Sequence, residues 1–204
     1  MIAGCGSGVA GELGSGDDEA SADRVRVTAL LGRPPQGRFE VVVRSSSGDP
    51  VVIRNEALLD DGTPMPTRFW LVDPALRAEV GRLEAAGGVR RAEAEVGAAA
   101  LAAAHVRYAA ERDASLPVGH AGPRPSGGVG GTRTGVKCLH AHLAWYLAGG
   151  DDPVGAWVVG QLPLDALGDL SPTTDPHRAS SASRHRIGAD SVPTGIPVDD
   201  GGRG

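Results

Sequence analysis

Glycine and proline confine any packed core of this chain to its middle. Its 204 residues include 31 glycines and 15 prolines, most of them at the two ends and in one internal stretch, residues 115–131. Glycine loses the most conformational entropy on folding and proline has no backbone N–H, so neither suits the interior of a helix or strand. Because only 3% of the residues are aromatic, we expect a core of Val, Leu and Ala between these stretches.

The two ends of the chain lack the apolar periodicity of folded segments. Residues 1–21 are rich in Gly and Ser, and residues 171–204 are rich in Ser, Thr, Pro and Gly. Segments of this composition bury too little apolar surface to offset the entropy that is lost on ordering. We predict a disordered tail over 1–21, a single globular domain over 22–165 and a second disordered tail over 166–204.

Three segments in the first half of the chain have the composition of β-strands. Residues 39–44, 51–54 and 68–72 are rich in β-branched and aromatic side chains, which suit a pleated, half-buried surface. A cluster of turn-forming residues at 45–50 separates the first two segments, as in an antiparallel hairpin. We therefore predict a small antiparallel three-stranded sheet.

Apolar residues recur at helical spacing in most of the other segments. We predict helices at 23–31, from Asp73 to the stop at Gly87, at 91–114, at 134–148 and at 151–159. The chain is therefore expected to be α+β, with the sheet packed against four to five helices. Residues 115–131 are expected to form a long loop, which in a compact domain is either a mobile functional lid or disordered.

Charge, cysteine content and hydropathy narrow the classes of function. The net charge is -5 and the pI about 5.6, which argues against nucleic-acid binding because that depends on a basic surface. No apolar run approaches the roughly 18 residues that span a bilayer, and Cys5 and Cys138 offer no disulfide framework. We expect a cytoplasmic protein with no nucleic-acid or membrane partner, no cofactor, and a protein partner that the sequence does not identify.

The stretch 130–149 concentrates the polar groups that carry chemistry. Glycines let backbone N–H groups approach an anion closely, and a helix N-terminus adds unpaired N–H groups and a partial positive charge. Arg133 and Lys137 add full charges next to the backbone of Thr134 and Gly135. We predict an anion site there, although Val136 follows Gly135 and the ending of a phosphate-binding P-loop is absent. The alternative is a flexible loop with solvated cations.

A second polar set lies on the predicted helix 91–114. His105, Tyr108 and Arg112 are spaced i, i+3 and i+7 and share one helix stripe. They are candidate ligand-binding residues that could complete the pocket together with His140. The alternative is the rim of a packing interface with a solvated arginine.

Cys138 and His142 are candidate metal ligands. At about 100° per residue on a helix, their side chains fall within about 40° of each other, and His140 points about 160° away from Cys138. A zinc site usually needs three or four ligands, and the spacing requires no further ones. We therefore predict no metal site but a buried thiol among packing imidazoles, with a metal site at Cys138 and His142 as the alternative.

Three residues are candidates for catalysis. Cys138, near a helix N-terminus and beside Lys137, is a candidate nucleophile, and His140 and His105 are candidate acid–base groups. Glu84 has no charged partner four residues away on its own helix, so it either pairs with a cation in the cleft or is simply exposed.

Five motifs together resemble the actinobacterial family called domain of unknown function 501. They are residues 33–35, 61–67, 81–84, 135–142 and 149–155, in the expected order, and the Lys-Cys-Leu-His block is the most specific of them. The resemblance spans about residues 24–162 and brings no established activity. It implies a gene neighbourhood with enolase, a septum-formation initiator and an exopolyphosphatase. Relatives carry cysteine where this chain has Ser45 or Ser47 and Cys or His near Asp73, which implies that a metal site there would lack ligands here.

The leading functional prediction is a protein that binds an anionic ligand, bearing phosphate or carboxylate, at the N-terminus of the 134–148 helix. One alternative is an enzyme that acts on a phosphorylated metabolite with Cys138 or His140. The other is an interaction protein linked to cell division.

Overall fold

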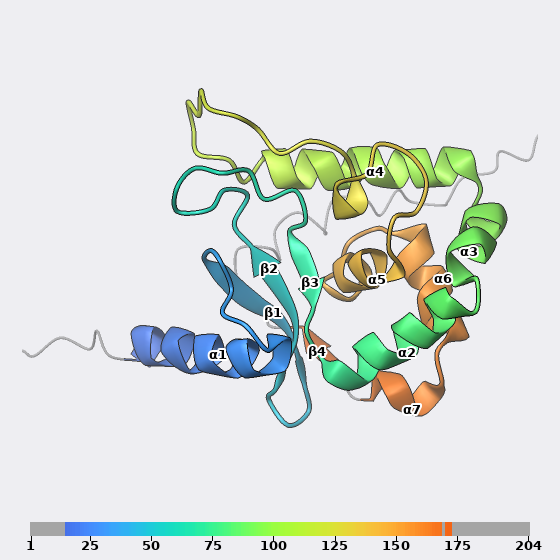
Figure 1. Ribbon diagram of the computed structural model, residues 1–204, viewed down its shortest axis with the longest axis horizontal. Coiled ribbons are helices and arrows are strands. Elements are labelled where there is room, and N and C mark those ends of the chain that lie inside the picture. The colour runs from blue at the N-terminus through green and yellow to red at the C-terminus, as the bar shows by residue number, and fades with distance from the viewer. Residues whose placement is uncertain (1–14, 169, 173–204) are drawn as a thin grey trace, which may run out of the picture. The chain divides into compact units, whose positions relative to one another are not determined.

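The fold is organised around an antiparallel sheet with helices packed on both faces (Figure 1). The computed structural model describes residues 15–168 and 170–172. The strands are β1 (Phe39–Ser45), β2 (Pro50–Asn55), β3 (Phe69–Leu71) and β4 (Leu170–Pro172). The helices are α1 (Ser15–Leu31), α2 (Pro74–Ala85), α3 (Gly88–Val96), α4 (Ala98–Asp113), α5 (Leu139–Leu147), α6 (Pro153–Gln161), α7 (Leu164–Leu167) and the 3-10 helix η1 (Val129–Gly131).

The sheet confirms the predicted class and the predicted strands. Its order is β3-β2-β1-β4, and the β1–β2, β2–β3 and β1–β4 pairs are all antiparallel. The three predicted strands correspond to β1, β2 and β3. The short strand β4 adds to the free side of β1, where Val43 lies opposite Pro172. The sheet therefore includes residues beyond the predicted end of the domain at 165.

Residues of β1 and β2 contribute to two separate cores. Val41 and Ile53 lie opposite each other in β1 and β2 and pack with Val27 of α1 in the smaller core. Val43 and Val52, on the other face, belong to the larger core that the later helices form. Val41 and Val43 would share a face of a regular strand, but the register of β1 shifts between them, as at a β-bulge, so they lie in different cores on either side of the sheet.

Helix α5 lies within the larger core, against β3 and α6 (Figure 1). The helix predicted at 134–148 is shorter, because Gly135 has a left-handed φ of +66° and Cys138 is extended with φ of -161°. Neither conformation belongs to an α-helix. Arg133 and Lys137 therefore lie in the loop before the helix and not in its first turn.

The helix predicted at 91–114 is divided in two. Gly97 has φ of +81°, which ends α3 and starts α4 at a bend. Only glycine takes this conformation without strain, and the alanines around it gave no sign of a break. After α4 the segment 115–131 returns along that helix (Figure 1), and Arg112 Nη1 donates to the carbonyl of Gly127.

Both predicted tails overlap with regular structure. Helix α1 begins at Ser15, and the acidic residues Asp18 and Glu19 suit the N-terminal part of a helix, where negative charge is favoured. Helix α7 begins at the end of the predicted domain and continues into the predicted second tail, and strand β4 lies wholly within that tail. The rest of the two tails, residues 1–14, 169 and 173–204, lies outside the described residues.

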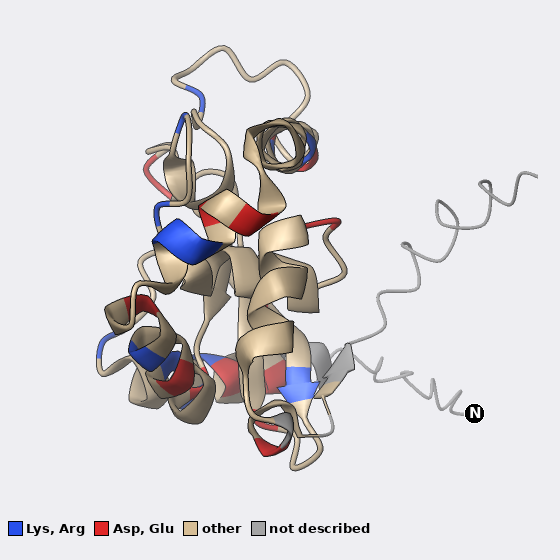
Figure 2. Cartoon of the chain, turned by 90° about the vertical axis from the view of Figure 1, so that its right-hand side faces the viewer, with Lys and Arg blue, Asp and Glu red and all other residues tan. Residues whose placement is uncertain are grey.

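In the cartoon of Figure 2, positions of basic and of acidic residues are interspersed along the elements drawn in colour. None of the helices among the described residues has both the length and the apolar character needed to cross a bilayer.

Candidate functional site

The N-terminus of α5 is capped by a carboxylate from another helix. Cys138 is the N-cap residue but makes no side-chain cap. Instead, the N–H of Leu139 donates to Glu84 Oε1 of α2 at 2.6 Å. A helix N-terminus attracts negative charge, and here the chain supplies that charge itself. The tertiary partner of Glu84 is therefore the start of α5.

His140 joins Glu84 and Cys138 in one cluster. Its Nδ1 lies 3.2 Å from Glu84 Oε1 and 3.5 Å from Cys138 Sγ. Its Nε2 lies 3.1 Å from the carbonyl oxygen of Arg77, which can only accept, so Nε2 carries the proton. The hydrogen bond with Cys138, followed by that with Arg77 and the charge of Glu84, raises the pKa of His140 to about 9 against the opposing effect of burial.

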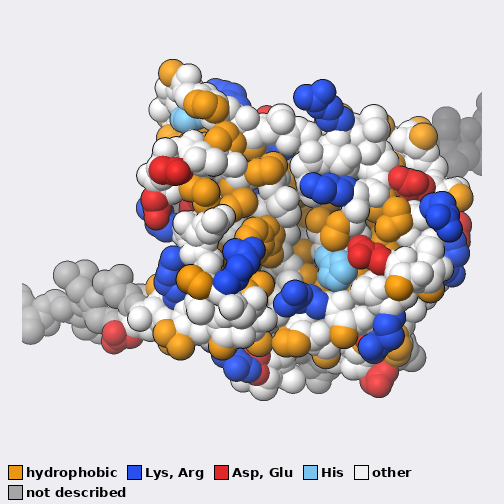
Figure 3. Space-filling model, in the orientation of Figure 1, with side chains coloured by type: hydrophobic (Ala, Val, Ile, Leu, Met, Phe, Trp, Pro, Cys, Tyr) orange, Lys and Arg blue, Asp and Glu red, His pale blue; other side chains and the backbone are white. Residues whose placement is uncertain are grey.

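The cluster borders a pocket of about 330 Å³. Cys138, His140 and Arg77 line it together with apolar side chains of the sheet, among them Phe69 and Trp70. The side chains of Glu84 and His140 are each 27% exposed, so solvent reaches the cluster. On the face shown in Figure 3, a histidine lies beside an acidic side chain with basic and hydrophobic side chains around them.

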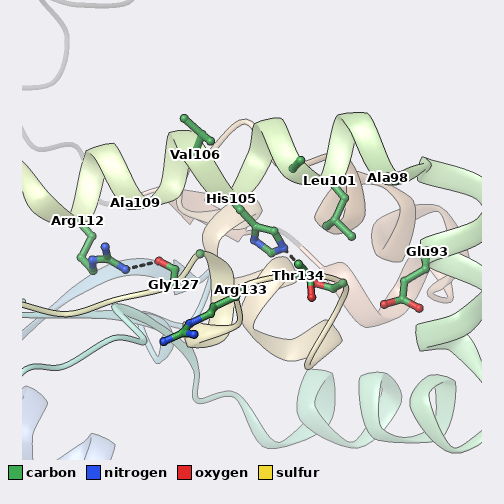
Figure 4. Close-up of a pocket in the computed structure, with 13 residues that line it drawn as sticks. Glu93, Ala98, Leu101, His105, Val106, Ala109, Arg112, Gly127, Arg133 and Thr134 are labelled. Carbon is green, nitrogen blue, oxygen red and sulfur yellow. Dashed lines mark hydrogen bonds between the residues drawn. The ribbon is translucent and has the colours of Figure 1, made fainter.

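A larger cavity of about 740 Å³ lies between α4 and the loop at 127–135. The apolar part of its α4 wall consists of Ala98, Leu101, Ala102, Val106 and Ala109. Its polar groups are spread along its length (Figure 4). Arg112 and Arg133 lie toward one end, Glu93 lies at the other, and His105 lies between them.

His105 fastens this loop to α4. Its Nδ1 accepts a hydrogen bond from the N–H of Val129 at 3.1 Å, and its Nε2 donates to the carbonyl of Gly135 at 3.0 Å. Only the neutral imidazole protonated on Nε2 satisfies both bonds. Burial, partly offset by the bond to Gly135, lowers the pKa of His105. His105 therefore has a structural role, because both of its ring nitrogens already form hydrogen bonds to the loop.

The two arginines of the cavity differ in how far their donors are used. Arg112 is buried, with Nε and Nη2 on Asp113 Oδ1 and Nη1 on the carbonyl of Gly127. Arg133 is exposed and makes no hydrogen bond or ion pair within residues 15–168 and 170–172. Arg133 is thus the cation that remains free to bind a ligand.

A second carboxylate accepts a hydrogen bond from the backbone next to Gly135. Glu93 Oε1 of α3 accepts from the N–H of Val136 at 2.7 Å. A Cβ at Gly135 would lie 2.6 Å from that same oxygen, so glycine is needed for the approach. Glu84 and Glu93 thus accept from the amides of Leu139 and Val136, which lie next to the backbone of Thr134 and Gly135 that was predicted to hold an external anion.

Comparison of the sequence with known protein families identifies the family of this chain. The family described as "Protein of unknown function (DUF501)" matches residues 41–160, more than half of the chain. The chain belongs to the DUF501 family. A search of curated proteins and a search of solved structures each found no significant match. The DUF501 region runs from β1 to α6 and contains the residues of the cluster at Glu84 and of the larger cavity.

Three of the predicted ligand-binding residues of this DUF501 protein lie away from the cavity, and one of them, His140, lines the smaller pocket instead. Lys137 donates from Nζ to the carbonyl of Gly130 at 3.3 Å and does not line the cavity. Tyr108 is buried in the core, where its hydroxyl accepts from the N–H of Arg68 at 2.7 Å and donates to the carbonyl of Pro66. Arg133, Thr134, Gly135, His105 and Arg112 do lie together around the cavity.

The structure brings Cys138 together with His140 and not with His142. Because Cys138 is extended, the angle of 100° per residue does not apply to it, and the imidazole two residues on reaches its sulfur. His142 is fully buried and lies 2.7 Å from Asp152 through Nδ1. The Cys138–His142 pair considered from the sequence is therefore replaced by Cys138, His140 and Glu84.

Sequence reasoning missed Glu93 and Arg77 as members of the two sites. Glu93 is 43 residues from Val136, and the carbonyl of Arg77 is 63 residues from His140. No local spacing connects such residues. A sequence signal was present only at Glu84, which had no charged partner on its own helix.

Proposed function

We propose that this chain binds a small molecule with an apolar body and an anionic head group, carboxylate or phosphate, in the cavity between α4 and the loop at 127–135. The free guanidinium of Arg133 at the edge of an apolar cavity is the observation that carries the proposal. This proposal keeps the predicted ligand class and moves the site away from the start of α5.

The cavity has the size and lining of a small-molecule site. Its volume of about 740 Å³ falls within the roughly 300–1,000 Å³ of ligand pockets, which are mostly apolar with a few placed polar groups. Val106 on its wall is 69% exposed. An apolar ligand body lying along α4 would cover it.

The charges favour an anionic head group at one end. Arg133 offers unused donors, and buried Arg112 adds a positive charge nearby. Arginine recognises carboxylate and phosphate groups through its fork of N–H donors. Glu93 at the opposite end would repel a second negative group, so the ligand should carry its charge at one end only.

The start of α5 is a weaker place for the ligand than the sequence suggested. The carboxylate of Glu84 already accepts from Leu139, and that of Glu93 accepts from Val136. A ligand anion there would have to displace a carboxylate of the chain. The cavity needs no such exchange.

Titration calorimetry with octanoate, octyl phosphate and octanol tests the proposal. We expect one site for each anion and at least tenfold weaker binding of the neutral alcohol. Arg133→Gln should raise the Kd for the anions about tenfold to a hundredfold, because a hydrogen bond to a charged group contributes about 1.5–3 kcal/mol. Its effect on octanol should be small.

The matched control is Arg124→Gln, which removes an exposed arginine outside the cavity lining. It should leave all three affinities unchanged. Val106→Asp should weaken all three ligands, because it places a negative charge on the apolar wall. Equal losses in the two arginine variants, or no binding of either anion at millimolar concentration, would overturn the proposal.

Three other expectations stay predictions. They are an enzyme that acts with Cys138 or His140, an interaction protein linked to cell division, and a cytoplasmic location in an actinobacterium. Of the three candidate catalytic residues, Cys138 and His140 border the smaller pocket. Both ring nitrogens of His105 make hydrogen bonds to backbone groups.

A further inference from the structure

We propose that Glu84, Cys138 and His140 bind a divalent transition-metal ion of the zinc class, with a coordination position open toward the smaller pocket. The site is separate from the cavity proposed for the anionic ligand. Neither proposal depends on the other.

The three ligand atoms already have the spacing of a coordination shell. Zinc bonds of about 2.3 Å to sulfur and about 2.0–2.1 Å to nitrogen place two tetrahedral ligand atoms about 3.5 Å apart. Cys138 Sγ and His140 Nδ1 are 3.5 Å apart, and Nδ1 and the Glu84 carboxylate are 3.2 Å apart. All three ligand atoms lie within 4.8 Å of one another. An ion could therefore enter with small side-chain adjustments.

The imidazole is oriented as a metal ligand would be. The Nε2–H of His140 donates to the carbonyl of Arg77, which leaves Nδ1 as the nitrogen that faces Glu84 and Cys138. Metal-binding histidines commonly donate their other N–H to a carbonyl or carboxylate, which fixes the ring. The N–H of Leu139 holds Glu84 in the same way.

The ligands are held by packed elements and are still reachable. Cys138 and His140 flank Leu139, which is fully buried, and Glu84 projects from α2, which packs against α5. Cys138 and His140 also line the smaller pocket, beside Arg77 and Trp70. Three protein ligands and one open position are typical of a catalytic rather than a structural zinc site.

The set of donors indicates which metals fit. One thiolate, one imidazole and one carboxylate favour zinc, cobalt or nickel over magnesium and calcium, which prefer oxygen ligands. Binding replaces the protons of the thiol and of Nδ1 with the metal. Protons should therefore be released to the buffer as the ion is bound.

Cobalt titration of the Cys5→Ser protein tests the site, since this background removes the only other thiol of the chain. We expect a thiolate-to-cobalt charge-transfer absorption that saturates at one ion per chain and is displaced by zinc. Cys138→Ser and His140→Gln should abolish the absorption or weaken zinc binding at least a hundredfold. His120→Gln, at a histidine outside the cluster, should change neither.

Glu84→Gln separates the metal role from the capping role. The amide oxygen can still accept from Leu139, so the fold should persist by circular dichroism, and zinc affinity should fall at least tenfold. As an independent readout, zinc should protect Cys138 from iodoacetamide in the folded protein. The proposal is overturned if no absorption saturates at one ion per chain, if His140→Gln leaves it unchanged, or if zinc leaves alkylation unaffected.

Discussion

Asp152 Oδ2 lies 2.7 Å from His142 Nδ1, and both side chains are buried in the interior of the protein. The other oxygen of Asp152 accepts from the N–H groups of Val154 and Gly155 at the start of α6. One carboxylate thus joins α5 to α6 and caps the second helix.

Replacing Asp152 by Ala should destabilise the protein by about 2–4 kcal/mol. The change leaves a buried donor on His142 unpaired, at about 1–3 kcal/mol, and removes a helix cap, at about 0.5–2 kcal/mol. Asp152→Ser keeps a cap acceptor and should lie in between. Chemical denaturation measures the difference. Asp151→Ala is the control, because Asp151 is exposed and paired with Arg107, and a loss as large as that of Asp152→Ala would contradict the assignment.

Stability should fall as the pH drops below about 6.5, the unperturbed pKa of histidine. Burial lowers the pKa of His105 in the folded chain, so below this pH the unfolded chain binds a proton that the folded chain does not, which favours unfolding. His142 further lowers the pKa of His105, whereas Asp152 raises it.

Denaturation of the wild type and of His105→Gln between pH 5 and 8 measures this contribution as a difference in slope. The variant should be less stable at pH 8, because Val129 and Gly135 lose their partner. Its free energy of unfolding should also decrease less than that of the wild type as the pH falls below about 6.5. Parallel curves for the two proteins would show that His105 does not titrate as proposed.

The hydroxyl of Tyr108 should contribute about 1–3 kcal/mol to the free energy of unfolding. Tyr108→Phe keeps the ring in the core but removes the acceptor of the buried N–H of Arg68, and an unsatisfied buried donor costs about that much. Thermal and chemical denaturation give the value. Tyr146→Phe is a matched control, because Tyr146 is only half-buried, and it should change stability by less than about 0.5 kcal/mol.

Two glycine-to-alanine substitutions should change the stability of the protein in opposite directions. Gly81 lies within α2 with nothing within 4 Å of an added Cβ, so Gly81→Ala should stabilise by about 0.5–1 kcal/mol. Gly135 has a φ of +66° and the Glu93 oxygen in the way, so Gly135→Ala should destabilise by about 1 kcal/mol or more. Denaturation midpoints of the two variants decide the matter, and a stabilising Gly135→Ala would show that the loop can rearrange.

Local signals predicted the parts of the fold that depend on neighbours in sequence. The turn cluster at 45–50 indicated the hairpin, and α2 begins next to Asp73 as predicted, with the Asp73 carboxylate accepting from the N–H of Leu76 at 2.8 Å. Asp152 caps α6 in the same manner. These features follow from two to four adjacent residues, so one sequence suffices to find them.

The sequence-based predictions that were wrong concern features that depend on a single backbone conformation or on residues distant in the sequence. The break at Gly97 is a choice of one φ angle within a strongly helical stretch, and the extended backbone of Cys138 turns its thiol toward His140. Glu84 and Glu93 reach the loop before α5 from other helices. Periodicity within one helix carries no information on such contacts.

The pairing of β4 with β1 has a practical consequence for recombinant work. A truncated chain that stops at residue 165 would lack the segment opposite Val43, Arg44 and Ser45. It would leave an open edge on the sheet, which can recruit a second molecule and promote aggregation. Expression boundaries should therefore extend beyond residue 172.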